Sequence, residues 1–271
     1  MMPPAYVKPY VKRGKTYAAD AEAICEAVTR PTMRFGAIKW KEQQAVLMLH
    51  KARELLVRQR TMLTNAIRAH LAEFGMIAAQ GPGGLALLLS VYREDAGQMP
   101  VLAREAITIL VDQCQHAQQQ IAVLEAKILE WHRADPASKR LATIPGVGSV
   151  TASAIAASVP DASLFRSGLF RSGRQFAAWL GLTPKAHSSG GKERALGISK
   201  QGDGYIRRLL VVGATAVLRY ARQDNDRKAW AARLLAGKWP KVVAVALANK
   251  TARLAWAMLK RNEIYIAPRA A

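Results

Sequence analysis

Two long stretches of the chain place apolar residues at helical spacing. In the first, from about Glu42 to Ala72, Leu49, Leu56 and Leu63 recur seven residues apart, with Val46 and Ile67 on the adjoining row. The second begins after Pro100 and ends at about His132. Its apolar stripe consists of Ile107, Val111, Cys114, Ile121, Leu124, Ile128 and Trp131. Such spacing predicts two long helices, each with one packed face, as in a coiled coil or a helical bundle.

The segment between these helices is rich in turn residues. Gly75 and the run Gln80-Gly81-Pro82-Gly83-Gly84 interrupt the periodicity, and a short helix is predicted over Leu85–Tyr92. Two helices of similar length joined by such a connection should pair antiparallel, within one chain or between subunits. We favour a dimerisation arm.

The N-terminal segment is basic up to residue 16 and contains several prolines, so we expect it to be extended. Helical periodicity starts at Thr16, which can cap the helix. Asp20, Glu22 and Glu26 are the acids of the first forty residues. A two-metal nuclease site needs several converging acids, and this segment does not supply them.

A glycine turn separates two apolar runs, 138–144 and 150–158. Gly146 and Gly148 flank Val147 and allow a tight turn, after which a helix begins at once. The free N–H groups of that helix could bind a phosphate oxygen without reading the base. The pattern resembles a helix-hairpin-helix motif; the alternative is an ordinary tight turn.

A second glycine-rich stretch follows an apolar helix that ends at Gly181. We expect the segment from Lys185 to Gly197 to be irregular. It contains two serines, two glycines and cations, namely Ser188, Ser189, Gly190, Gly191, Lys192 and Arg194. An exposed serine hydroxyl surrounded by positive charge can attack a phosphodiester, although a flexible loop explains the same residues.

The next segment, Ser199 to Asp203, repeats the phosphate-binding pattern. Ser199 or Asp203 can cap the helix that follows, Tyr205–Arg222, and Lys200, Gln201, Arg207 and Arg208 could contact phosphate. Trp230, Trp239 and Trp256 lie in the last helices among lysines and arginines. Tryptophans at such positions belong to a core or form a stacking surface for bases.

The charge of the chain points to a polyanionic partner. Its 271 residues include 40 Lys and Arg against 19 Asp and Glu, a net charge of +21. Nucleic acid fits this excess better than an anionic membrane surface, and the longest uncharged apolar run, Leu209–Leu218, is too short to span a bilayer. Cys25 and Cys114 form no ligand motif, so we expect a reduced, cytoplasmic protein without structural zinc.

Taken in order, these motifs resemble the IS-one-ten family of insertion-sequence transposases. The resemblance rests on Ile-Pro-Gly-Val-Gly at 144–148, Trp-Leu-Gly-Leu-Thr-Pro at 179–184, Ser-Ser-Gly-Gly-Lys at 188–192, and Ile-Ser-Lys-Gln-Gly-Asp at 198–203 followed by Tyr-Ile-Arg-Arg-Leu-Leu. Residues 14–24 resemble the end of that family's N-terminal nuclease-like domain. Nearly the whole chain is covered.

The resemblance implies a DNA recombinase. The family joins a RuvC-like domain, with four metal-binding acids and Mg²⁺, to a coiled-coil arm and a serine-bearing C-terminal domain, and a structured RNA guides it. The attacking serine falls at Ser189 or Ser188, with Ser189 preferred, and the last of the four acids falls at Asp20. We expect nucleic-acid contacts at Lys15, Gly146, Gly148, Lys185, Lys192, Arg194, Lys200, Gln201, Arg207 and Arg208. A homo-oligomer, dimeric or tetrameric, is expected, with no membrane partner.

The chain departs from the family pattern near its start. Tyr17 stands where the family has an acid, and the strands for the first two acids are missing, which indicates an N-terminally truncated, inactive copy. A five-residue sequence is also duplicated within 164–173. We therefore predict a mainly α fold with most of the RuvC-like sheet absent. Its parts would be a remnant at 1–41, a helical arm at 42–136 and a C-terminal domain with helix-hairpin-helix and serine loop at 137–271. A nucleic-acid-binding, dimerising protein without catalysis is the alternative function.

Overall fold

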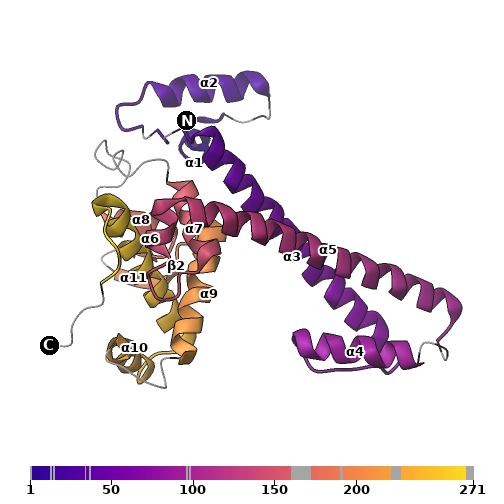
Figure 1. Cartoon of the computed structure of the whole chain (residues 1–271). Helices are drawn as coiled ribbons and strands as arrows, with labels where there is room; N and C mark the ends of the chain where they lie inside the picture. Colours follow the sequence, from indigo (N-terminus) through magenta and orange to yellow (C-terminus); the bar gives the residue numbers. More distant parts are fainter. Residues whose placement is uncertain are drawn as a thin grey trace. The chain divides into compact units, whose positions relative to one another are not determined.

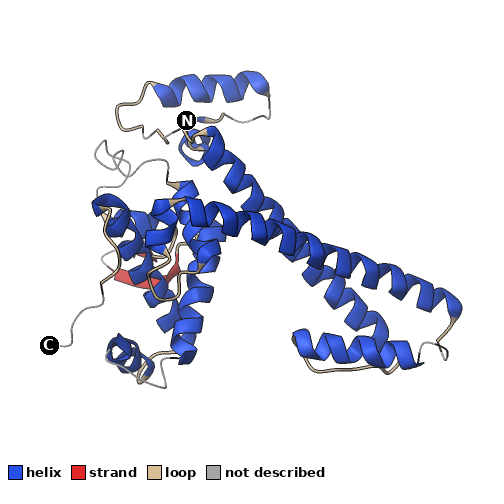
Figure 2. Cartoon of the chain, viewed as in Figure 1, coloured by secondary structure: helices blue, strands red, loops and turns tan. Residues whose placement is uncertain are grey.

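The protein is mainly α-helical, as predicted. A computed structural model describes residues 2–266 except 13, 15, 34, 37, 96, 98, 160–171, 190–191 and 221–226, and for 186–189 and 192–196 it describes the backbone alone. Within these residues the sheet is a single two-stranded hairpin (Figure 2). The chain divides into two compact units, 47–131 and 1–46 with 132–271.

The first unit is a helical arm. Helix α3 spans Lys41–Ala72, α4 spans Pro82–Asp95 and α5 spans Val101–Ala134, close to the predicted ranges (Figure 1). Side chains join α3 to α5 in one antiparallel register: Arg53 contacts Glu125 at 2.6 Å, Arg60 donates to Gln118 at 2.6 Å, and the Thr64 hydroxyl lies 3.7 Å from the Cys114 sulfur. The antiparallel pair therefore forms within one chain.

Apolar packing at the end of the arm joins all three helices. Ile67 and Leu71 of α3 pack with Leu88 of α4 and with Ile107 and Val111 of α5 in one buried cluster. The predicted stripe on α5 is the face that is buried here. The arm therefore has a core of its own.

A second set of contacts holds the loop after α3. The Arg68 guanidinium donates to the carbonyls of Ala78, Ala79 and Gly81 at 2.9 to 3.2 Å. Gly84 packs so closely on this loop that a Cβ there would lie 1.7 Å from the Ala79 oxygen. A glycine-rich connection is thus required by packing as well as by the turn.

The N-terminal segment is helical over residues 4–10, where the prediction of an extended chain was wrong. Helix α1 spans Pro4–Val7 and a 3-10 turn, η1, spans Lys8–Tyr10. Each has a proline in its first positions, where the fixed φ of proline suits a helix and its missing N–H has no partner to lose. Helix α2 spans Tyr17–Val28, and the Thr16 hydroxyl accepts from Ala19 N–H, which confirms Thr16 as its cap.

The C-terminal part of the second unit is built from helices, of which α11 (Pro240–Arg261) packs against the largest number of others. Helix α6 spans Pro136–Leu141, α7 spans Ser149–Ser158, α8 spans Gly173–Trp179 and α9 spans Gly204–Tyr220. They are followed by α10 (Arg227–Leu235) and α11 (Pro240–Arg261). Every residue from Thr151 to Ala157 is buried, mostly small side chains that allow close packing. The duplicated sequence lies outside the described residues except for Ser172 and Gly173.

Helix α11 packs against α8, α9 and α6. By length and composition it is the one helix in the described part of the chain that could cross a membrane. Its residues Ala244, Ala248, Ala252 and Ala255 are almost fully buried among the other helices. Helix α11 is therefore buried in the way that the core helix of a folded domain is.

Candidate nucleic-acid interface

The turn between α6 and α7 is a type II β-turn. Val147 N–H donates to the Ile144 carbonyl at 3.0 Å, with Pro145 and Gly146 as the central residues. Gly146 has φ +83°, the conformation that a type II turn requires at this position and that glycine adopts without strain. The turn also packs on α9, because a Cβ on Gly146 would lie 2.8 Å from Val217 Cγ2 and 2.9 Å from the Gly213 oxygen. Gly146 is therefore explained by packing and backbone conformation.

Gly148 occupies a different environment, two residues further on. It is the N-cap of α7 with φ −82° and ψ 176°, which any residue can adopt. It is exposed, and a Cβ there would meet nothing within 4 Å. Gly148 has no side chain to accept from the N–H groups of the first turn of α7, so an approaching phosphate oxygen could do so. Of the two predicted glycines, Gly148 is the one placed for such a contact.

The loops at 179–184 and 198–203, which belong to separate motifs, bond to each other through their backbones. Gly181, at φ +68°, ends α8 with N–H bonds from Gly181 and Leu182 back to Ala178 and Ala177. Lys200 N–H then donates to the Gly181 carbonyl at 3.1 Å. A Cβ on Gly202 would lie 1.8 Å from the Trp179 oxygen. The glycines of both motifs are needed for this close backbone contact.

The second predicted phosphate-binding turn is closed by an acid. Asp203 Oδ1 accepts from Tyr205 N–H at 2.8 Å and from Ile206 N–H at 3.1 Å, so the carboxylate occupies the amides of α9 that a phosphate would need. The capping role predicted for Asp203 is confirmed. With these two amides occupied by a carboxylate, they are not available to a phosphate oxygen, and the phosphate contact of this turn stays a prediction.

Arg207 also has a structural role. Its Nη1 donates to the carbonyls of Leu180 and Gln201 at 2.8 and 2.7 Å and holds the two loops together. Asn249 of α11, which the sequence gave no reason to single out, donates to the Leu182 carbonyl at 3.1 Å. The Arg207 guanidinium was predicted to contact phosphate. In the structure its hydrogen bonds fix the two loops.

Those two loops form the base of a β-hairpin. Strand β1 spans Pro184–Ser189 and pairs antiparallel with β2, Lys192–Ile198, so the prediction of an irregular segment was wrong. A pair of glycines between two runs is a hairpin signal, but these strands carry little apolar alternation. The register pairs Ser189 with Lys192 and Ser188 with Glu193. Both candidate serines thus lie at the end of the hairpin away from its fixed base.

Several of the predicted cations are exposed around this base. Lys185, Lys200 and Arg208 are exposed, as is the neutral Gln201, and Lys200 has φ +56°, unusual for a residue other than glycine. The register places Lys192 and Arg194 on β2, opposite Ser189 and His187. Gly213, against which the first turn packs, lies nine residues beyond the start of α9, about 14 Å along the helix. Helix α9 therefore connects the two parts of the interface.

Asp20 lies in the first turn of α2 and is exposed. An acid there is favoured by the helix dipole. Its neighbours in sequence, Glu22 and Glu26, form ion pairs with Lys12 and Arg30. In the described residues no group of three His, Cys, Asp or Glu comes together, so the residues present do not fit a Mg²⁺ ion. Lys15 lies outside the described residues.

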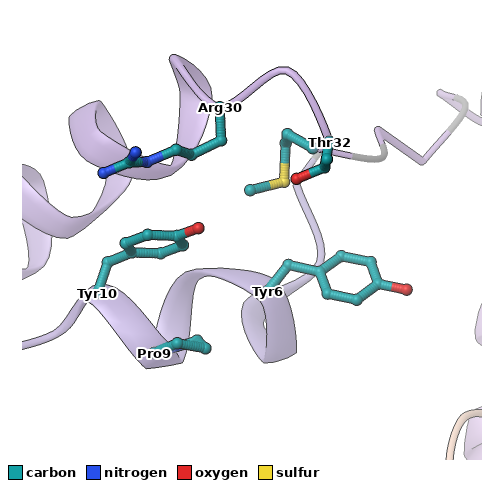
Figure 3. Close-up of a pocket in the computed structure, with 6 residues that line it drawn as sticks. Tyr6, Pro9, Tyr10, Arg30 and Thr32 are labelled. Atoms are coloured by element: carbon teal, nitrogen blue, oxygen red, sulfur yellow. The ribbon is translucent and has the colours of Figure 1, made fainter.

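The N-terminal segment has a small pocket of its own, about 290 Å³, between α1, η1 and the segment that follows α2. Figure 3 shows the Arg30 side chain lying over the ring of Tyr10, with the guanidinium carbon 5.6 Å from the ring centre. This cation–π contact fixes α2 on the preceding turn. Arg30 therefore has a packing role in this segment.

Residues 138–230 match the family model of the IS116/IS110/IS902 transposases. A Sinorhizobium fredii protein named as a transposase is 48% identical over 98% of this chain and 67% of its own length. A Pseudomonas aeruginosa protein named as a family 20 transposase is 46% identical over 98% of this chain and 78% of its own length. The transposase for insertion sequence element IS1111A of Coxiella burnetii is 39% identical over 98% of this chain and 72% of its own length.

Proposed function

Because the chain belongs to the IS116/IS110/IS902 family of transposases, we propose that it acts on DNA in the transposition of an insertion element, with Ser189 as the attacking residue. The observation that carries the proposal is the β1–β2 hairpin. Its base is fixed by Lys200 N–H on Gly181, by Arg207 and by Asn249. These contacts anchor the two strands that carry Ser189 and Lys192, and an attacking group needs an anchored support.

The strand register favours Ser189 over Ser188. Directly opposite residues are the closest cross-strand neighbours, and Ser189 is opposite Lys192 whereas Ser188 is opposite Glu193. A cation stabilises the extra negative charge that develops on a phosphodiester during attack, and a carboxylate opposes it. Ser189 therefore has the better partner.

The proposed step is a transesterification. The Ser189 oxygen forms a bond to phosphorus, one P–O bond to deoxyribose breaks, and the serine proton is transferred to the departing sugar oxygen. The product is a phosphodiester between Ser189 and the cut strand. A hydroxyl of a second strand can attack this phosphodiester, which joins the two strands and releases the serine. His187 is a candidate for moving the proton. No step is assigned to a metal ion.

The DNA backbone would be held by two groups of residues. The exposed first turn of α7 at Gly148 offers N–H groups, and Lys185, Lys200 and Arg208 offer charge at the hairpin base. Such contacts release counterions, so affinity should fall steeply as salt rises. A guide RNA and further copies of the chain are proposed as additional partners on the family resemblance.

A second function is a nucleic-acid-binding, dimerising protein without catalysis. The observation in its favour is that the described acids near Asp20 are paired with cations and gather no metal site. Such a protein would occupy the same DNA without cutting it.

The two functions are separated by a covalent adduct assay. The chain is incubated with labelled DNA carrying the ends of its element, and protein–DNA adducts are measured on a denaturing gel. We expect an adduct that Ser189→Ala abolishes and Ser188→Ala, the matched control, retains. DNA binding without any Ser189-dependent adduct would support the non-catalytic function.

A further inference from the structure

A groove on the surface of α11 shares only Asn249 with the contacts that fix the hairpin base. It has a volume of about 760 Å³ and lies between α11, the start of α8 and α10. We call it the α11 groove and define it by Arg174, Trp230, Asn249, Lys250, Arg253 and Trp256. This volume is within the range of sites that hold organic ligands.

The groove exists because α11 has two distinct faces. Ala246, Lys250, Arg253 and Ala257 recur at three and four residues and line the groove. The opposite face carries the buried alanines of the core. Gly173 brings α8 close to α11, since a Cβ there would lie 3.0 Å from the Arg253 oxygen. The groove is therefore built on a rigid core helix.

The lining is cationic and aromatic. Arg174, Lys250 and Arg253 are exposed, and among the described residues that line the groove there is no Asp or Glu. Among the described residues none of these three cations is in an ion pair with a carboxylate. Lys250 Nζ lies over the Trp230 ring, 4.8 Å from its centre, so one face of this indole carries a cation.

We propose that the α11 groove binds an unpaired segment of nucleic acid, with a base stacked on Trp230 and adjacent phosphates on Lys250, Arg253 and Arg174. Stacking on an indole needs an accessible base face, which a duplex hides between its base pairs. Repeated cations beside an aromatic ring are what single-strand binders use. The proposal rests on the proposed function only in that the chain acts on nucleic acid.

The test compares single-stranded and duplex probes. Fluorescence anisotropy at low salt would measure the Kd of labelled oligo-dT and oligo-rU of about 20 nucleotides, enough to cover one binding site, and of a duplex of the same length. We expect Trp230→Leu to weaken binding of a single strand about fivefold to tenfold, with less than about a twofold change for the duplex. Trp230→Phe, which keeps an aromatic face, should retain most of the affinity. The oligo-dT and oligo-rU arms identify the nucleic acid preferred.

Two controls keep the result interpretable. Trp239→Leu removes an indole that is 81% exposed and outside the groove, so it should leave single-strand affinity unchanged. Arg253→Gln, at an exposed position, should reduce the salt slope by about one if a phosphate contact is lost, and it replaces Trp230→Leu if that variant does not fold.

Unchanged single-strand affinity in Trp230→Leu, or an equal loss for single strand and duplex, would overturn the groove proposal and leave the proposed function standing. Stronger displacement of oligo-dT by polyglutamate than by unlabelled oligo-dT would also overturn it, in favour of an acidic protein segment. A wild-type chain that binds neither probe would overturn the proposed function itself.

Discussion

Substitutions at Gly146 and Gly148, two glycines of the α6–α7 turn, should have different effects. One should lower stability and the other should weaken DNA binding. Gly146→Ala places a Cβ at φ +83°, which costs about 1–2 kcal/mol. Its clash with Val217 Cγ2 at 2.8 Å and the Gly213 oxygen at 2.9 Å adds about 1–3 kcal/mol of overpacking. The total is about 2–5 kcal/mol, a large part of the stability of a domain.

At Gly148 the same reasoning gives a different result. Gly148→Ala meets no atom within 4 Å, and it should cost no more than about 1 kcal/mol because Ala is a poorer N-cap than Gly. Gly148→Asp supplies a capping carboxylate, so it should preserve or slightly raise stability. It would also occupy the N–H groups of α7, and the loss of a charge-assisted hydrogen bond to phosphate should weaken DNA binding about tenfold.

Thermal unfolding and anisotropy on a duplex measure the two effects. Gly146→Ala should lower Tm by about 5–15 °C, at about 2–4 °C per kcal/mol, whereas Gly148→Asp should unfold like the wild type and bind DNA of all sequences more weakly. If Gly146→Ala unfolds like the wild type, the contact of the turn with α9 is refuted. If Gly148→Asp binds as tightly as Gly148→Ala, the phosphate contact at α7 is refuted.

Three further substitutions address other contacts. Arg207→Lys keeps the charge but loses the bonds to two loop carbonyls. Urea unfolding should show a loss of about 1.5–3 kcal/mol, and DNA affinity should stay within about twofold of the wild type. A loss of affinity at unchanged stability would mean that Arg207 contacts DNA. Desolvation by burial lowers the pKa of His132 from its ordinary 6.5, so the unfolded chain takes up more protons and stability should fall as pH drops below about 6.5 towards that lowered pKa. Thermal melts of His132→Asn should show a smaller decrease between about pH 7 and pH 5 than the wild type, and parallel curves would exclude His132 as the cause. A double-mutant cycle on Arg53 and Glu125 should give a coupling of about 0.5–1 kcal/mol, and a coupling of zero would mean that this pair adds nothing to the arm.

Local patterns predicted the helices well and the interface only in part. The seven-residue spacing of leucines on α3 and the stripe on α5 gave both long helices, and Thr16 and Asp203 were recognised as caps because capping depends on adjacent residues. The sequence left open whether α3 and α5 pair within one chain, because the same apolar face serves either arrangement. The contacts of Arg53, Arg60 and Thr64 answer that question for the single chain.

The sequence alone could not reveal contacts whose partners lie far away along the chain. Arg207 was expected to face phosphate because exposed arginines often do, but its acceptor at Leu180 is 27 residues away. The β-hairpin was missed because its strands have few apolar residues, although the glycine pair between them is a local hairpin signal. Gly146 was expected to face DNA, and its contact with Gly213 could not be read from the turn alone.

The length of the arm can change only in steps that keep the register between α3 and α5. Arg53 and Arg60 are one heptad apart on α3, and their partners Glu125 and Gln118 are one heptad apart on α5. Excising seven residues from one helix would leave these partners one heptad out of step. Excising seven from both would restore every pairing and shorten the arm by about 10 Å. The length of the arm can therefore change in matched heptad steps without a change of register.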